Sequence, residues 1–136
     1  MLIETEKITL QIPSSPENFK LIYPFIEQLR ANWDINDDLA ANIELVLGEA
    51  VNNGIIHGNQ GDEKKLVSVS AENIANNLVL IISDEGEGFN YNNLPDPTLP
   101  ENIECPTGRG VFLMNQLADL IIYSNNGSTI EVQFKL

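Results

Sequence analysis

The sequence predicts an α+β two-layer sandwich, in which helices cover one face of a mixed, mostly antiparallel sheet. Two observations predict this class. Segments of alternating apolar residues, which are typical of strands, come in adjacent pairs, and only a few segments repeat apolar residues at helical spacing. The resulting order is strand, helix, helix, strand, strand, long loop, helix, strand, strand. Paired strands with so few helices favour helices layered on one face of a sheet.

The N-terminal part of the chain predicts one strand and one helix. Apolar and polar residues alternate in residues 3–12, which indicates a half-buried strand. Ser15 as N-cap and Pro16 at the first helical position predict a helix start, and apolar residues then recur at helical spacing as far as Trp33. Because Pro24 lies inside that pattern, we expect a kink or a late start of the helix.

The middle of the chain predicts a long helix followed by two strands. The helix is expected from Asn36 or Asp37 to Gly58. Alternating apolar residues in 67–71 predict a strand. After a turn, the continuous apolar run 78–82 predicts a central strand that is buried on both faces.

The C-terminal part predicts a loop, a helix and a hairpin. Residues 85–107 are polar and carry glycines and prolines, so we expect a long irregular loop, and such loops in compact domains are usually functional. Residues 110–120 return to a helical pattern. Residues 121–123 and 129–134 are expected to pair as a hairpin around the turn at 125–127.

The composition limits the class of protein. The chain has 136 residues, which fits a single domain spanning residues 1–136, and its net charge is −13. Nucleic acid and anionic membranes are poor partners for such a surface, because neutralising phosphate needs clustered Lys and Arg. The single cysteine excludes an internal disulfide, and no stretch approaches the roughly 18 apolar residues that span a bilayer. Because the N-terminus also lacks the pattern of a signal peptide, we expect a cytoplasmic protein.

Glu49 and Asn53 form the first candidate site. They lie four residues apart in the long predicted helix, so their side chains share one face. A carboxylate and an amide oxygen there suit a hard cation such as Mg²⁺, or a hydroxyl group. A solvated Glu–Asn pair on the helix surface explains the same spacing. Gly48 and Gly54 beside them indicate either the close approach of a ligand or tight packing of the helix.

Asp84, Gly86 and Gly88 form an Asp-x-Gly-x-Gly motif directly after the most apolar strand. Asp84 is therefore expected at the end of that strand, where ligands of open sheets tend to bind. A carboxylate there can accept a hydrogen bond from an exocyclic amine such as that of adenine. Gly86 would admit a flat base, and Gly88 would serve as a hinge for a lid. A tight acidic turn without a ligand is the alternative.

Gly108, Arg109 and Gly110 precede the last predicted helix. The free N–H groups at a helix start bind phosphate, and glycines let the phosphate approach. Arg109 is the only basic residue between Lys65 and Lys135. A flexible helix start with a solvent-facing Arg is the alternative. The Walker pattern G-x-x-x-x-G-K-[ST] is absent, so a P-loop does not supply the phosphate site.

Together the three motifs resemble the ATP-binding fold shared by gyrase, MutL and histidine kinases, whose boxes are E-x-x-x-N, D-x-G-x-G and G-x-G. Within that superfamily the chain looks most like the anti-sigma-factor serine/threonine protein kinases of bacteria, through residues 48–58 and through residues 96–114 with their short proline-bearing lid. The resemblance spans nearly the whole chain. One departure is Gly54, which stands where relatives usually carry Ala.

The resemblance implies a role for each motif residue. Glu49 would be the general base that accepts a proton from a serine hydroxyl, and Asn53 would coordinate Mg²⁺. Asp84 would bind the adenine amine, and Thr129 would help to bind adenine, often through water. The other residues implied in binding ATP are those of the two glycine motifs, Gly86, Gly88, Gly108, Arg109 and Gly110.

The resemblance also implies ATP and Mg²⁺ as cofactors, a homodimer and two protein partners, a sigma factor and a small anti-anti-sigma protein phosphorylated on Ser or Thr. Two alternatives differ in chemistry. A histidine-kinase-type ATPase module would need a phospho-accepting histidine on a dimerising helix pair, whereas His57, the only histidine, lies in the predicted ATP helix. A non-catalytic switch would sequester a partner in a nucleotide-dependent way and transfer no phosphate.

Overall fold

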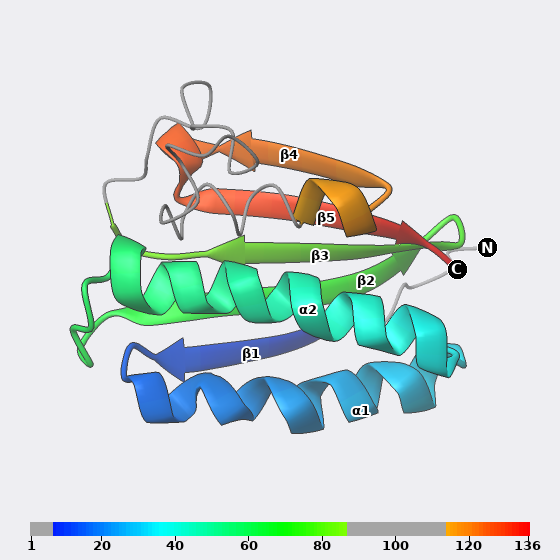
Figure 1. The fold of residues 1–136 in the computed structure, drawn as a ribbon, viewed down its shortest axis with the longest axis horizontal. Helices are drawn as coiled ribbons and strands as arrows, with labels where there is room; N and C mark the ends of the chain where they lie inside the picture. Colours follow the sequence, from blue (N-terminus) through cyan, green and yellow to red (C-terminus); the bar gives the residue numbers. More distant parts are fainter. Residues whose placement is uncertain (1–6, 87–113) are drawn as a thin grey trace, which may run out of the picture.

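The computed structural model describes residues 7–86 and 114–136, and these residues form a two-layer α+β sandwich. Five strands make one open sheet in the order β1-β2-β3-β5-β4, and each of the four described pairings is antiparallel. The helices α1 and α2 lie on the same face of the sheet (Figure 1). The predicted fold class is confirmed. The sheet was expected to be mixed and mostly antiparallel, and its described part is antiparallel throughout.

The elements follow the predicted order. The strands are β1 (Lys7–Pro13), β2 (Leu66–Ile74), β3 (Asn77–Ser83), β4 (Leu120–Ser124) and β5 (Thr129–Lys135). The helical elements are η1 (Pro16–Leu21), α1 (Ile22–Trp33), α2 (Asp37–Asn53), η2 (Gly54–Gly58) and η5 (Asn125–Gly127), and residues 114–117 are also helical. Within this described part, no helix combines the length and apolarity that crossing a membrane requires.

The strand β3 occupies the centre of the sheet and carries much of the core. Leu78, Leu80 and Ile82 are buried in the core cluster with residues from both helices. Side chains alternate along a strand, so Val79 lies on the opposite face, and it is buried as well. The prediction of a central strand buried on both faces is therefore confirmed, although Ile81 is only partly buried.

The first helix starts late, as Pro24 predicted. Ser15 has the extended conformation of an N-cap and Pro16 follows it, but the first turns are the 3₁₀ helix η1. The α-helix α1 begins only at Ile22. Pro24 thus falls in the first turn of α1, where an N–H group has no partner within the helix and proline is tolerated.

The helix α2 ends differently from the prediction. Its start is confirmed, because the Asn36 side chain caps it by accepting a hydrogen bond from the Leu39 N–H group at 2.8 Å. The α-helix was expected to reach Gly58, yet it ends at Asn53 and continues as the single π-helical turn η2. The Asn59 N–H group closes that turn by donating to the Gly54 carbonyl at 2.8 Å. Turns of this kind are rare and often occur at functional sites.

The last predicted helix also ends earlier than expected. Residues 114–117 are helical, but Leu120, which the pattern placed in the helix, is the first residue of β4. The reason is that pairing with β5 takes over: the Asp119 N–H group donates to the Gln133 carbonyl, and the Asp119 carboxylate accepts from the Lys135 N–H group. The predicted hairpin is confirmed, with η5 as its turn.

Candidate functional site

Glu49 and Asn53 lie near the C-terminal end of α2, and Asn53 is its last residue before the π turn. Both side chains are partly buried, so each is held near the protein surface but stays accessible. Among residues 7–86 and 114–136, no side chain is shown bonded to either of them, and no group of three or more acidic, His or Cys side chains could hold a metal ion. The pair therefore suits a cation such as Mg²⁺ that takes most of its oxygen ligands from phosphate and water.

The glycines beside this pair pack against protein. A Cβ atom at Gly48 would lie 3.2 Å from the ring of Phe19, and one at Gly54 would lie 3.0 Å from a methyl group of Val67. The Cβ position of Gly54 is also 3.6 Å from the Cβ atom of Asp84. Of the two explanations that the sequence left open, packing accounts for both glycines, and Gly54 brings α2 directly against the Asp-x-Gly-x-Gly motif.

Asp84 lies immediately after β3, as predicted, and two glycines enclose its carboxyl group. A Cβ atom at Gly58 would come within 2.3 Å of the Asp84 Cγ atom, and one at Gly86 would come within 2.0 Å of the Gly58 carbonyl oxygen. The Asp84 Oδ1 atom accepts a hydrogen bond from the Gly86 N–H group at 2.8 Å. The end of α2 and the tip of β3 thus meet at one end of the sheet (Figure 1). The backbones of Gly58 and Gly86 lie against each other beside the Asp84 carboxyl group.

Burial and a neighbouring N–H group shift the pKa of the Asp84 carboxyl group in opposite directions. Burial raises the pKa of the carboxyl group, and the hydrogen bond from Gly86 offsets part of this rise. The two ion pairs within the described residues, Lys7–Glu72 and Arg30–Asp37, involve other carboxylates. A half-buried carboxylate of this kind gains from a neutral N–H donor such as the amine of a purine base.

The pairing of β3 with β5 determines where Thr129 lies relative to Asp84. Its Oγ1 atom lies 3.0 Å from the Ser83 Oγ atom and accepts a hydrogen bond from the Asn125 side chain at 3.1 Å. Thr129 is paired with Ser83, whereas the Asp84 N–H group donates to the carbonyl of Ser128 at 2.9 Å. Thr129 thus lies one residue from the main-chain contact of the Asp84 N–H group, and its role in binding adenine stays a prediction.

Four predicted site residues lie outside the described residues. They are Gly88, at the end of the Asp-x-Gly-x-Gly motif, and the phosphate-binding candidates Gly108, Arg109 and Gly110. The loop predicted as a lid lies there as well. Of the predicted site, the structure therefore brings together the end of α2, Asp84 and Gly86.

One residue of this region was missed by the sequence analysis. Asn59 follows the π turn, is only 1% exposed and hydrogen-bonds to the main chain of Glu85, next to Asp84. Its only signal in the sequence is a polar residue directly after a helix-ending glycine, which is common in ordinary turns.

Comparison with known proteins agrees with this geometry. The family described as histidine kinase-like ATPase domain matches residues 12–134. The chain is 24% identical to serine-protein kinase RsbW of Bacillus velezensis, over 96% of this chain and 86% of that protein. It is 26% identical to serine-protein kinase RsbW of Staphylococcus epidermidis, over 92% and 84%, and 26% identical to that of Bacillus cereus, over 96% and 85%. With the family match covering nearly all of its length, the chain belongs to the histidine kinase-like ATPase domain family.

Proposed function

We propose that this protein is a serine/threonine protein kinase that uses Mg-ATP, acts as an anti-sigma factor and phosphorylates a small anti-anti-sigma protein. The observation that carries the proposal is the Asp84 carboxylate at the tip of β3, enclosed by Gly58 and Gly86 beside the end of α2. Membership of the histidine kinase-like ATPase domain family supports the binding of ATP. The names of the relatives, serine-protein kinases that match most of the chain, support the kinase part.

In this proposal the base of ATP is recognised at Asp84. The exocyclic amine of adenine donates a hydrogen bond to the carboxylate, which the backbones of Gly58 and Gly86 hold in place. Asn53 holds Mg²⁺, which offsets charge on the phosphates when bound. Gly108, Arg109 and Gly110 would bind the phosphates, and Thr129 would help to bind adenine. Gly86 and Gly88 complete the motif that begins at Asp84.

The chemical step is an in-line phosphoryl transfer. The hydroxyl oxygen of a Ser or Thr on the partner forms a bond to the γ-phosphorus, and the bond from that phosphorus to the β–γ bridging oxygen breaks, so that ADP leaves. Glu49 accepts the proton of the hydroxyl group. The protein supplies position and charge, and no change of oxidation state is involved.

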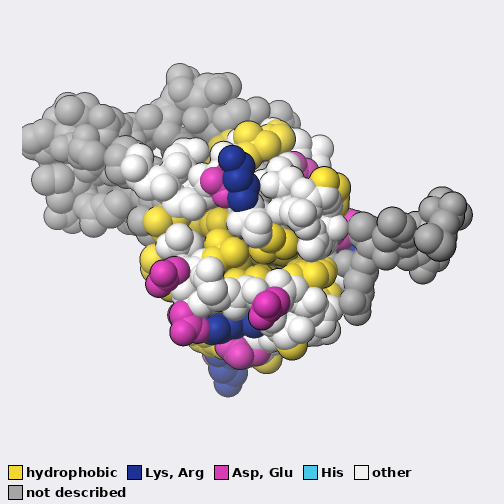
Figure 2. Space-filling model, turned by 90° about the vertical axis from the view of Figure 1, so that its right-hand side faces the viewer, with side chains coloured by type: hydrophobic (Ala, Val, Ile, Leu, Met, Phe, Trp, Pro, Cys, Tyr) yellow, Lys and Arg dark blue, Asp and Glu magenta, His cyan; other side chains and the backbone are white. Residues whose placement is uncertain are grey.

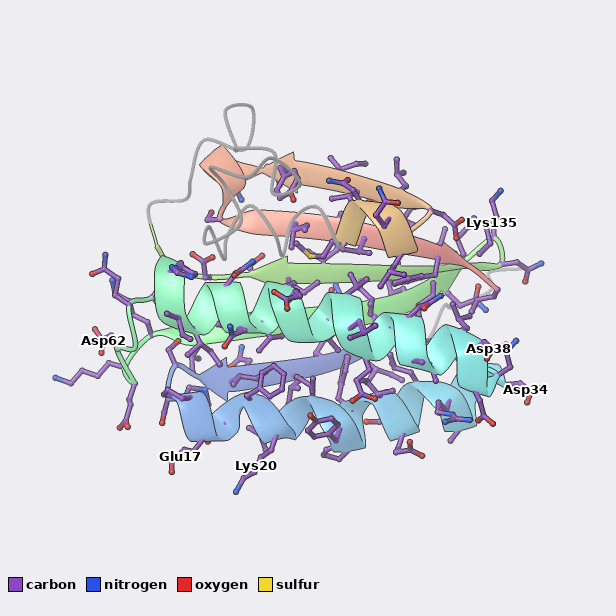
Figure 3. The ribbon with its side chains drawn as sticks, viewed as in Figure 1. Glu17, Lys20, Asp34, Asp38, Asp62 and Lys135 are labelled. Carbon is purple, nitrogen blue, oxygen red and sulfur yellow. The ribbon has the colours of Figure 1, made fainter. Side chains whose placement is uncertain are left out.

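Binding of nucleotides tests the role of Asp84. We expect wild-type protein to bind Mg-ATP more tightly than Mg-GTP in calorimetric titrations, because guanine carries an acceptor where adenine carries the amine. Asp84→Asn should weaken ATP binding by roughly 10- to 100-fold, since it replaces a charged acceptor of the adenine amine by a weaker, neutral one. Asp38→Asn is the matched control, because Asp38 is an exposed acid at the other end of α2 (Figure 3). An unchanged ATP titration for Asp84→Asn would refute the adenine role.

Phosphotransfer tests the role of Glu49. We expect Glu49→Gln to bind Mg-ATP normally and to phosphorylate a purified anti-anti-sigma protein about 10²- to 10⁴-fold more slowly, which is the usual contribution of a general base. The intact mass of the substrate protein gives the rate. Glu44→Gln, an exposed glutamate of the same helix, should phosphorylate at the wild-type rate. Wild-type turnover by Glu49→Gln would remove Glu49 as the base.

The same assay separates the alternatives. Acid-stable phosphate on Ser or Thr supports the proposal, whereas acid-labile phosphate on a partner histidine would favour a histidine-kinase-type module. Nucleotide-dependent capture of the partner without phosphate on either protein would favour a non-catalytic switch. The sigma factor as second partner and the homodimer are proposed from the family resemblance, and size-exclusion chromatography coupled to light scattering tests the dimer.

A further inference from the structure

Both N–H groups and the oxygen of the Asn59 side chain have hydrogen-bond partners inside the protein. Its Nδ2 group donates to the Ser14 Oγ atom at 2.8 Å and to the Leu66 carbonyl at 3.1 Å. Its Oδ1 atom accepts from the Glu85 N–H group at 2.7 Å. A primary amide has two donors and one acceptor oxygen, so all three functions are used. One side chain therefore joins the end of β1, the start of β2 and the residue after Asp84.

The turn that carries Asp84 is held by three successive N–H groups. The Asp84 N–H group donates to Ser128 in the hairpin turn, and the Gly86 N–H group donates to the Asp84 carboxylate itself. Only the middle bond, from Glu85 to Asn59, ties the turn to the helix side of the sheet. The Glu85 carboxylate adds an exposed link to the start of β2 by accepting from the Leu66 N–H group.

The position of Asn59 along the chain makes this bond a distance constraint. Its N–H group closes the π turn at Gly54, and the residue before it, Gly58, is the one whose backbone lies against the Asp84 carboxyl group. A shift of the Asp84 turn away from α2 would have to break the Asn59 bond first. In the same way, a shift toward α2 is blocked because backbone already meets backbone at Gly58 and Gly86.

We infer that Asn59 is a positioning residue for the nucleotide-binding carboxylate: its Oδ1 atom fixes the Asp84 turn against the end of α2, and so sets the distance between the base-binding acid and the Glu49–Asn53 edge. This inference rests on the proposed ATP site. The alternative is that Asn59 has a purely structural role and only joins three chain segments. In that case its loss would lower stability and leave the recognition of the base unchanged.

Ser14 provides the matched control for this distinction. It is fully buried, bonds to the same Asn59 side chain and donates to the Lys65 carbonyl at 2.8 Å, but it does not contact the Asp84 turn. Removing either side chain leaves buried polar groups without partners, so both changes should lower the melting temperature. Only the loss of Asn59 should release the Glu85 N–H group.

The experiment measures the dissociation constants of Mg-ATP and Mg-GTP by calorimetry at a temperature where circular dichroism shows each variant folded. We expect Asn59→Ala to weaken ATP binding by about tenfold, with GTP binding nearly unchanged, so that the preference for adenine collapses. Ser14→Ala should keep the ratio of the two constants within twofold of wild type. Asn59→Asp, which keeps the accepting oxygen and loses both donors, should also keep most of the preference.

Each outcome decides whether Asn59 positions the Asp84 turn or has a purely structural role. A folded Asn59→Ala protein with the wild-type ratio, or a Ser14→Ala protein that loses the ratio equally, would overturn the inference. If Asn59→Ala does not fold, loss of the ratio in folded Asn59→Asp would overturn it. Hydrogen exchange of the wild-type protein needs no variant: the Glu85 amide should be protected, and exchange as fast as in the exposed loop at 60–64 would also overturn it. Absence of ATP binding by wild type would instead remove the proposed function.

Discussion

The two ends of the sheet are built by different means. At one end, where β3 ends and β5 begins, side chains and glycines organise the chain: Asn59 bonds to the main chain of Glu85, and Gly58 and Gly86 allow backbone to meet the Asp84 carboxyl group. At the other end, β2 turns into β3 through two residues of positive φ, Ala75 at 51° and Asn76 at 65°, and exposed hydrogen bonds from the Asn77 side chain to main-chain carbonyls support the turn.

The side chains at the surface of the two ends also differ in polarity. Figure 2, which faces the turn between β2 and β3, shows hydrophobic side chains gathered across that end, and its exposed apolar residues include Ile74, Leu120 and Leu136. The Asp84 end instead retains a half-buried carboxylate whose pKa is raised by burial. A half-buried polar group that lowers stability is typical of a binding site. Changes at the two ends should therefore have different effects on nucleotide binding.

The largest effect is expected at the backbone contact. In Gly86→Ala the new Cβ atom would lie 2.0 Å from the Gly58 carbonyl oxygen, and backbone cannot give way as a flexible side chain can. We expect a loss of about 1–3 kcal/mol in the free energy of unfolding and ATP binding at least tenfold weaker. Urea denaturation and calorimetry measure the two effects.

Gly61→Ala is the matched control for that change. Gly61 has a φ of 71° but has no atom within 4 Å of its Cβ position. Its substitution should cost about 1 kcal/mol from left-handed backbone strain alone and leave ATP binding as in wild type. Equal loss of ATP affinity in both variants would show that the close contact at Gly86 is unrelated to binding.

An intermediate effect is expected from Asp84→Asn on the protein without nucleotide. Burial raises the pKa of this carboxyl group in the folded state, so its contribution to stability is full below the unfolded pKa and is lost as the pH rises through the folded pKa. At pH 7 the ionised group therefore destabilises the fold, and Asp84→Asn should raise the free energy of unfolding by less than about 1 kcal/mol, because half-exposure screens the effect.

That gain should shrink as the pH falls through the raised pKa of the folded state, and it should be lost below the ordinary pKa of about 4, where the carboxyl group is protonated in both the folded and the unfolded protein. Urea denaturation at pH 7 and at pH 4 gives the comparison, provided that both proteins unfold reversibly. A variant that is less stable than wild type at pH 7 would contradict the view that Asp84 is kept for binding at the expense of stability.

The smallest effect is expected at the opposite end of the sheet. Both central residues of the β2–β3 turn have positive φ, a conformation that Asn adopts more readily than Ala. Ala75→Asn should therefore raise the free energy of unfolding by a few tenths of a kcal/mol, up to about 1 kcal/mol. ATP affinity should be unchanged in calorimetry. Altered nucleotide binding in this variant would contradict the prediction that only the Asp84 end of the sheet takes part in binding.

Patterns of near neighbours were enough to predict most of the fold. Alternation in β1 and β2, the apolar run of β3 and the helical spacing of α1 and α2 depend on which side chains share a face, and this is a property of local sequence. The same local logic explains why α1 starts late, at Ile22, so that Pro24 falls in its first turn. It failed where distant contacts compete with helix propensity, as at Leu120, which pairs in β4 because Asp119 is already bonded to β5.

The sequence by itself determined the family-like motifs, the α+β class and the position of Asp84 after the central strand, because these follow from residue types at short, fixed spacings. Only the tertiary structure decided what surrounds that carboxylate. Asn59 is 26 residues from Glu85 and 45 from Ser14 in the chain, and the π turn that places Gly58 on Asp84 has no distinctive pattern. Contacts of this kind form only when the helix layer packs on the sheet, so their partners are set by three-dimensional packing and not by neighbouring residues.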